Sequence, residues 1–184
     1  MSRENVQLVR TVFAPFEGIN VATIDWGADS FRELFAVRFS PDVELTTLAS
    51  GLGSGVGEHY SAWDGLIRYL TEWMEPFSEY QVENLDYIDA GDFVLIPSRQ
   101  WGIGAGSGVK AEIELTTLYE VRDGRITRIH QFDTLDEARA AAAKPACARA
   151  VAETPQAAFG RANRLTSTRA STASRAISRS SASV

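Results

Sequence analysis

The chain has 184 residues, a 45% apolar share and a formal net charge of −6. This length suits one domain with a further segment, and the apolar share can bury a core, which excludes a wholly disordered protein. The acidity argues against a general binder of nucleic acid or membrane surfaces, because a phosphate backbone requires a basic face. We therefore expect the folded part to have no nucleic-acid partner.

A single cysteine, Cys147, excludes an intrachain disulfide and a cysteine-built zinc cluster. The two histidines show no metal-ligand spacing, so we expect no metal and no cofactor. The N-terminal stretch 1–13 is charged where a secretory signal would be apolar, and no apolar run reaches the length of about 20 residues that spans a bilayer. These features predict a cytoplasmic protein without a membrane partner.

Charge divides the chain after residue 144. Residues 1–144 carry 12 basic and 23 acidic side chains, a balance of −11, whereas 145–184 carry six arginines and one acidic residue, a balance of +5. The second segment is rich in Ala and then in Ser, Thr and Arg, with too few apolar residues to offset the entropy of ordering. We expect a folded domain over 1–144 and a disordered tail over 145–184. A basic tail could bind an acidic partner or RNA, but a solvated tail is the simpler interpretation.

Three helices are predicted in the first half of the chain. Apolar residues recur at helical intervals over 6–16. Ser30 and Glu33 have capping-box spacing and predict a second helix that ends before Pro41. A third helix, opened by Ser61, carries an apolar face made of Trp63, Leu66, Ile67, Leu70, Trp73 and Met74.

After Pro76 the apolar spacing changes to period two. The pattern predicts four successive strands, Tyr80–Tyr87, Phe93–Trp101, Lys110–Val121 and Arg125–Asp133. Strands with such short links pair antiparallel, so three helices precede an antiparallel sheet, which is typical of an α+β fold. The glycine-rich run 101–108 is followed by a strand rather than a helix, so it predicts a hairpin and not a phosphate-binding loop.

Five segments carry a resemblance to a known family: MSRENVQLVRTVF at 1–13, PDVEL at 41–45, YIDAGD at 87–92, EVRDGRITRI at 120–129 and FDTLDEA at 132–138. In this order and spacing they resemble the SnoaL-like branch of the nuclear-transport-factor-2-like superfamily. The resemblance, over about residues 2–143, implies a cone-shaped α+β barrel, in which a strongly bent, mostly antiparallel sheet wraps around the helices. It also implies a deep pocket for an apolar small molecule, and a homodimer. It does not fix the activity, because the superfamily includes isomerases, polyketide cyclases, epoxide hydrolases and many non-enzymes.

Strand alternation divides the side chains of 111–121 between two faces. Glu112, Glu114 and Glu120 share one face, and the other face, which we expect to line the pocket, contains Ile113, Leu115, Thr117, Tyr119 and Val121. In the last strand, the resemblance places Ile129 and Gln131 inward and His130 outward. There we expect His130 to pair with the glutamates across strands.

The ketosteroid isomerase mechanism needs one carboxylate as a base and two acids that hydrogen-bond the enolate oxygen. Matching those enzymes to this chain places Val12, Thr46 and Thr117 at the three positions. Thr hydroxyls are too weakly acidic or basic to move a proton near neutral pH, and Val has no proton to give. We therefore do not expect this mechanism.

SnoaL-type cyclases and epoxide hydrolases place an acid on the last strand, where the resemblance finds Gln131, which can orient water or a carbonyl but cannot titrate. Arg99 matches the arginine of the hydrolases and would stabilise an oxyanion, but Trp101 stands where its neighbouring acid is expected. His59 lies in a loop that resembles the pocket rim, and imidazole suits proton transfer near neutrality, with Asp133 as its partner. A capping or surface role is the simpler interpretation of His59.

Two functions remain open. The first is a SnoaL-like isomerase, cyclase or hydrolase acting on an apolar substrate, with His59, Arg99, Gln131 and Asp133 as catalytic residues. The second is a non-catalytic protein of the same fold that binds a ligand or serves as a dimeric interaction module, and the missing acids favour it slightly. In either case the expected ligand contacts are Trp63, Trp101, Leu115, Thr117 and Tyr119, although core packing is the commoner role of aromatics in a helix.

Overall fold

The computed structural model describes residues 2–48 and 59–144, and the tail expected over 145–184, with Cys147, lies outside them. The elements of the described part are, in chain order, α1 (Ser2–Phe13), η1 (Ala14–Phe16), η2 (Val21–Thr23), α2 (Asp29–Arg38), β1 (Phe39–Thr46), β2 (His59–Ser61), α3 (Ala62–Met74), β3 (Phe77–Asn84), β4 (Ile88–Ala90), β5 (Phe93–Gly104), β6 (Lys110–Arg122), β7 (Arg125–Phe132) and α4 (Leu135–Ala142). The three N-terminal helices and the four later strands that the sequence predicts are all present.

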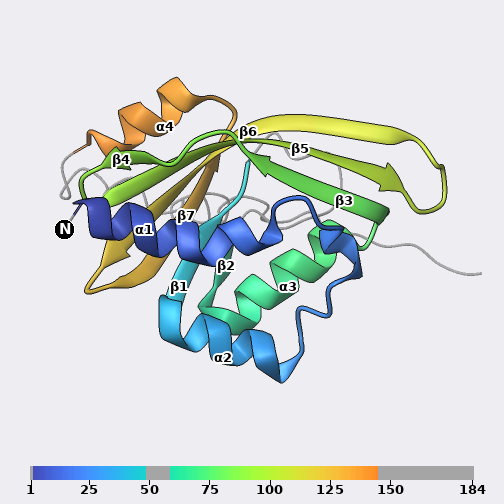
Figure 1. Ribbon diagram of the computed structural model, residues 1–184, viewed down its shortest axis with the longest axis horizontal. Helices are drawn as coiled ribbons and strands as arrows, with labels where there is room; N and C mark the ends of the chain where they lie inside the picture. Colours follow the sequence, from blue (N-terminus) through green and yellow to red (C-terminus); the bar gives the residue numbers. More distant parts are fainter. Residues whose placement is uncertain (1, 49–58, 145–184) are drawn as a thin grey trace, which may run out of the picture. The chain divides into compact units, whose positions relative to one another are not determined.

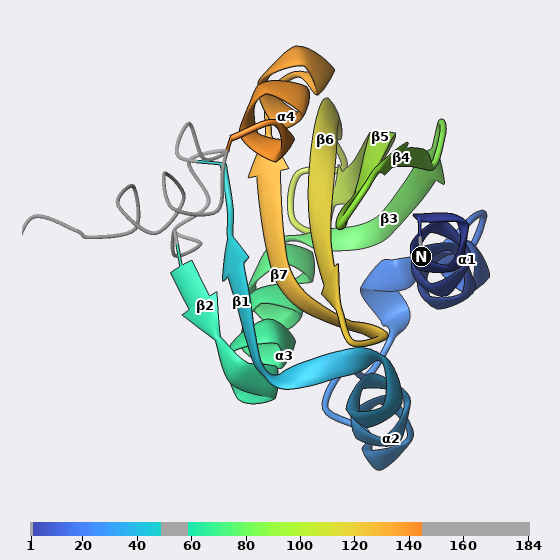
Figure 2. The ribbon, with the colours of Figure 1, turned by 90° about the vertical axis from the view of Figure 1, so that its left-hand side faces the viewer.

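The strands form one mixed sheet in the order β2-β1-β7-β6-β5-β3, and β4 pairs with β5. Every neighbouring pair is antiparallel except β1 and β7, which run parallel. The register shifts between Phe39 and Glu44 and between Glu120 and Val121. Such irregularities bend strands and increase their twist, and Figure 2 shows β1, β6 and β7 curving. The structure therefore confirms the α+β fold with a mostly antiparallel sheet.

Helices cover both faces of this sheet. Figure 1 shows α1, α2 and α3 on one side and α4 on the other. The larger core lies on the side of the first three helices, where α3 buries Leu66, Tyr69 and Trp73. A smaller core, made of Phe93, Leu95, Leu118 and Ala138, packs under α4.

The helix starts differ from the predicted caps. Ser30 lies inside α2, which begins after Ala28, because the backbone N–H of Phe31 already donates to the Ala28 carbonyl. Ser61 does precede α3, but its side chain makes no capping hydrogen bond. The capping box of the described chain forms instead at α4, between Thr134 and Glu137.

The hairpin predicted at 101–108 is present, and a second hairpin joins β6 to β7. Asp123 and Gly124 have positive φ of 50° and 72°, as a type I′ turn requires. The glycine-rich run joins β5 to β6, which pair along almost their full length. None of the helices in 2–48 and 59–144 has the length and apolarity of a membrane span.

Candidate functional site

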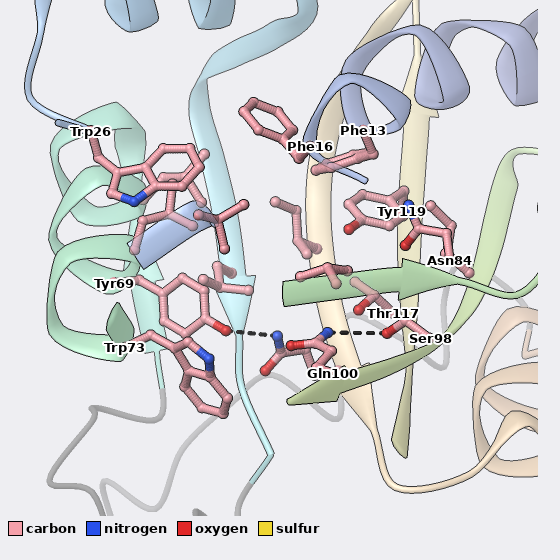
Figure 3. Close-up of a pocket in the computed structure, with 18 of the residues that line it drawn as sticks. Phe13, Phe16, Trp26, Tyr69, Trp73, Asn84, Ser98, Gln100, Thr117 and Tyr119 are labelled. Atoms are coloured by element: carbon pink, nitrogen blue, oxygen red, sulfur yellow. Dashed lines mark hydrogen bonds between the residues drawn. The ribbon is translucent and has the colours of Figure 1, made fainter. Parts of the chain in front are cut away.

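A cavity of about 140 Å³ lies between the first three helices and the sheet face that they cover. Figure 3 shows Trp26, Tyr69 and Trp73 on one side of it, and Tyr119, Thr117 and Ser98 on the other. Aromatic rings form much of the wall, and the aliphatic remainder includes Leu70 and Ile129. The cavity is therefore mainly apolar, as ligand pockets usually are.

Periodicity places these side chains. Tyr69 and Trp73 are one helical turn apart on α3, so they lie on one face, with ring centroids 5.8 Å apart. On the sheet, Thr117 pairs with Gln131 across β6 and β7, so both side chains emerge on the same face. Phe13, at the end of α1, covers Tyr119 at a ring-centroid distance of 4.6 Å.

Part of the polar lining is internally satisfied. The Tyr80 hydroxyl donates to Gln100 Oε1 at 2.8 Å, and Gln100 Nε2 donates to Ser98 Oγ at 3.0 Å. Burial raises the pKa of Tyr80 to about 12. At another part of the wall, Asn84 Nδ2 donates to Glu17 Oε1 at 2.8 Å. These amides are held by protein partners.

A second polar pair is not satisfied. Gln131 Nε2 donates to Tyr69 Oη at 2.7 Å, and both residues line the cavity. Gln131 Oε1 and Trp26 Nε1 are buried without a hydrogen-bond partner among the described residues. Most buried polar groups are paired, so these two atoms mark positions where a bound molecule can supply the partner.

The lining that the structure describes contains no carboxylate, imidazole, lysine or arginine. Its ionisable groups are tyrosines, and burial raises the pKa of both Tyr69 and Tyr119 above the ordinary value. Their hydroxyls therefore keep their protons near neutral pH and serve as hydrogen-bond donors rather than as bases. Within residues 2–48 and 59–144, no group of His, Cys, Asp and Glu side chains could hold a metal ion.

Three of the predicted site residues lie in the cavity wall, namely Thr117, Tyr119 and Gln131, and Ile129, which was expected to face inward, lies there too. Leu115 shares their face and is buried, but it lies further along β6 and does not line the cavity. Glu112 and Glu114 lie on the opposite, exposed side as expected. The alternation of this strand is thus as expected from Glu112 to Tyr119, although Ile113 and Val121, which were expected to line the pocket, are not in the cavity wall.

Arg99 and Trp101 lie on the other face of β5, away from the cavity. Arg99 forms ion pairs with Glu114 at 3.2 Å and with Glu83 at 3.7 Å. Lys110 lies over the Trp101 ring at 5.0 Å. The sequence placed both residues at the site, but their register on β5 turns them outward.

His59, Asp133 and Trp63 are also absent from the described cavity lining. His59 is exposed on β2, where its Nδ1 lies 3.5 Å from Thr46 Oγ1. Asp133 is exposed after β7, and Trp63 donates to the Ser40 carbonyl at 2.8 Å. Of the four proposed catalytic side chains, the structure brings only Gln131 to the cavity.

His130 lies outward, but it does not pair with the glutamates as expected. It stacks on Phe132 at a ring-centroid distance of 4.3 Å, and Arg128 is the residue that reaches Glu44 and Glu120. Burial lowers the pKa of His130, with Arg128 and Lys144 adding to the effect.

Sequence reasoning missed Trp26, Tyr69 and Gln100. Tyr69 follows Leu66 by three residues and precedes Trp73 by four, so the helical spacing already placed it on the inner stripe of α3. Trp26 lies in a segment without periodicity, between η2 and α2, and carries no such signal.

A bent sheet whose covered face encloses an apolar cavity under three N-terminal helices defines the nuclear-transport-factor-2-like class of α+β folds. A family model described as the SnoaL-like domain matches residues 25–129, which is more than half of the chain. The chain therefore belongs to the SnoaL-like domain family. No curated protein matches its sequence significantly.

Solved structures share the fold at low sequence identity. TerC, co-crystallised with polyporic acid, is 18% identical with a TM-score of 0.56, over 73% of this chain and 94% of TerC. A protein from Jannaschia sp. CCS1 described as a SnoaL-like polyketide cyclase is 20% identical with a TM-score of 0.55, over 78% of this chain and 95% of its own. A protein with a ketosteroid isomerase-like fold from Catenulispora acidiphila DSM 44928, in complex with trimethylamine, is 17% identical with a TM-score of 0.50, over 76% of this chain and 94% of its own.

Proposed function

We propose that the domain binds a small, uncharged, mainly apolar molecule in this cavity and acts as a ligand-binding pocket rather than as an acid–base enzyme. The observation that supports this most is the chemistry of the wall. In the part of the chain that the structure describes, aromatic and aliphatic side chains, amides and hydroxyls line the cavity, without any acid or base that titrates near neutral pH.

The size and polarity of the cavity favour a ligand with one ring. An apolar protein cavity of about 150 Å³ holds benzene, and the cavity here is about 140 Å³. A charged ligand would lose its hydration and find no opposite charge among the described lining residues, which is costly. TerC was co-crystallised with polyporic acid and the Catenulispora acidiphila protein with trimethylamine, so proteins of this fold are known with small molecules.

The catalytic alternative has less support. Turnover by His59, Arg99, Gln131 and Asp133 would require them to meet around one substrate, and three of them lie outside the described wall. Their catalytic roles stay predictions, and so do the homodimer, the cytoplasmic location and the disordered tail.

Titration calorimetry with toluene tests the binding proposal, because toluene is uncharged, apolar and of the expected size. Val82 lines the cavity, whereas Val109 is 65% exposed near the start of β6. Val82→Phe should fill part of the cavity and weaken toluene binding at least tenfold, and Val109→Phe, the matched control, should leave it unchanged. Absence of toluene binding by the natural sequence, or equal binding by both variants, would contradict the proposal.

A further inference from the structure

We infer, building on the proposed function, that the ligand is a neutral one-ring phenol whose hydroxyl group lies between the Tyr69 hydroxyl and the Gln131 amide. A mainly apolar cavity alone would accept benzene or toluene equally well. The unsatisfied hydrogen-bonding groups in the wall narrow the choice of ligand.

Gln131 has one half of its amide engaged and one half free. Nε2 donates to Tyr69 Oη at 2.7 Å, whereas Oε1 has no partner in the described part of the chain, although Gln131 is only 8% exposed. Because Tyr69 accepts this bond, its own hydroxyl proton remains available to donate, and no described acceptor takes it. The wall thus presents a free acceptor beside a free donor.

A hydroxyl group matches this arrangement. It can donate to Gln131 Oε1 and accept from the Tyr69 hydroxyl at the same time, so one ligand atom completes both groups. A buried group left unpaired carries its full desolvation cost, so a ligand that pairs it binds better than an apolar ligand of the same shape.

Gln100, the other glutamine of the cavity wall, differs from Gln131 in this respect. Gln100 donates to Ser98 and accepts from Tyr80, so neither half of its amide is free for a ligand. Two glutamines therefore line the same cavity, and only Gln131 offers a free oxygen.

The remaining wall favours a neutral aromatic ring. Aromatic rings line both sides of the cavity, with Trp26 and Trp73 on the side of Tyr69 and Phe13 and Tyr119 on the opposite side. Aromatic pairs in offset or edge-to-face contact gain stability beyond burial of area. A carboxylate in place of the hydroxyl would bring a charge that no described lining residue balances.

Calorimetric titrations of the full chain with toluene, phenol and benzoate at pH 7 separate this inference from the proposed function. Moving a hydroxyl from water into a cavity without a partner would make phenol about tenfold weaker than toluene. We expect the natural sequence instead to bind phenol at least as tightly as toluene, and benzoate at least tenfold more weakly than phenol.

Gln131→Met should remove the free acceptor and make toluene bind about tenfold more tightly than phenol. Gln81→Met is the matched control, because Gln81 lies on β3 outside the cavity wall and donates to Glu79. Gln81→Met should leave the ratio of phenol affinity to toluene affinity unchanged. A natural sequence that binds toluene about tenfold more tightly than phenol, or a ratio of the two affinities that Gln131→Met does not change, would overturn the phenol inference and leave the binding proposal standing. If neither toluene nor phenol binds, the phenol inference and the binding proposal are both contradicted.

Discussion

The Gln131 Nε2 atom of β7 lies 2.7 Å from the Tyr69 Oη atom of α3, so a single hydrogen bond joins the last strand to the third helix across the cavity. The two residues are 62 positions apart in the chain. Both residues are buried, so this bond is shielded from water.

Loss of the Tyr69 hydroxyl should therefore destabilise the fold through Gln131. Tyr69→Phe leaves the Gln131 amide without its remaining partner, and we expect a loss of about 1–3 kcal/mol in the free energy of unfolding. In a Gln131→Met background the same change should cost close to nothing, because no amide is then left unpaired. Urea unfolding of the two single variants and the double variant measures this coupling, and additive losses would argue against it.

Gly102 on β5 is expected to accept no side chain. A Cβ built there would lie 2.5 Å from a ring atom of Phe77 and 2.7 Å from one of Tyr80. Gly102→Ala should lower the free energy of unfolding by about 1–3 kcal/mol through overpacking. Gly106→Ala serves as the control, because a Cβ at Gly106 meets nothing within 4 Å. Equal melting temperatures of the two variants in thermal unfolding would contradict this packing.

Tyr80 should make stability depend on pH on the alkaline side. Burial raises its pKa from 10.0 to about 12 in the folded chain. The unfolded chain therefore loses this proton first, so the stabilisation is complete below about pH 10 and is lost as the pH rises toward 12. Tyr80→Phe should flatten the slope of unfolding free energy against pH in this interval, measured by urea titrations, and an unchanged slope would show that Tyr80 does not contribute.

Arg99→Ala tests whether the outer face of β5 takes part in binding. The guanidinium is bound to Glu114 on the side away from the cavity, and this hydrogen bond raises its pKa. Substitutions away from a site usually change free energies by less than about 0.5 kcal/mol, so toluene affinity should stay within about twofold. A tenfold loss of toluene affinity would instead support the sequence-based hypothesis that Arg99 belongs to the site.

Most of the fold could be predicted because its signals are local. Short stretches of sequence are enough to predict the apolar stripe of α3 and the period-two strands. The same holds for the turn at Asp123 and Gly124. The pairing of β1 with β7 is different, since it joins residues about 84 positions apart and depends on tertiary packing. The position of α4 over the second sheet face likewise depends on the small core that it buries.

The site was harder to predict because the first residues of β5 do not alternate between apolar and polar side chains. Its first four residues, Phe93–Ile96, are all buried, two toward each core, so no polar alternation tells which later residues face the cavity. The sequence-based interpretation chose Arg99 and Trp101, and the structure places Ser98 and Gln100 inward. Glu120 shows the same difficulty, since it lies outward as expected but is only 2% exposed and pairs with Arg122 and Arg128.

The four tryptophans allow the most direct test of the central claim that the cavity is the binding site. Trp26 and Trp73 line it, whereas Trp63 and Trp101 do not. Nitrogen-15 NMR spectra of the indole N–H groups, assigned with single Trp→Phe variants, can be recorded as toluene is added. We predict that the Trp26 and Trp73 signals move and that those of Trp63 and Trp101 stay in place. Signals that all remain fixed, or shifts confined to Trp63 and Trp101, would contradict the account.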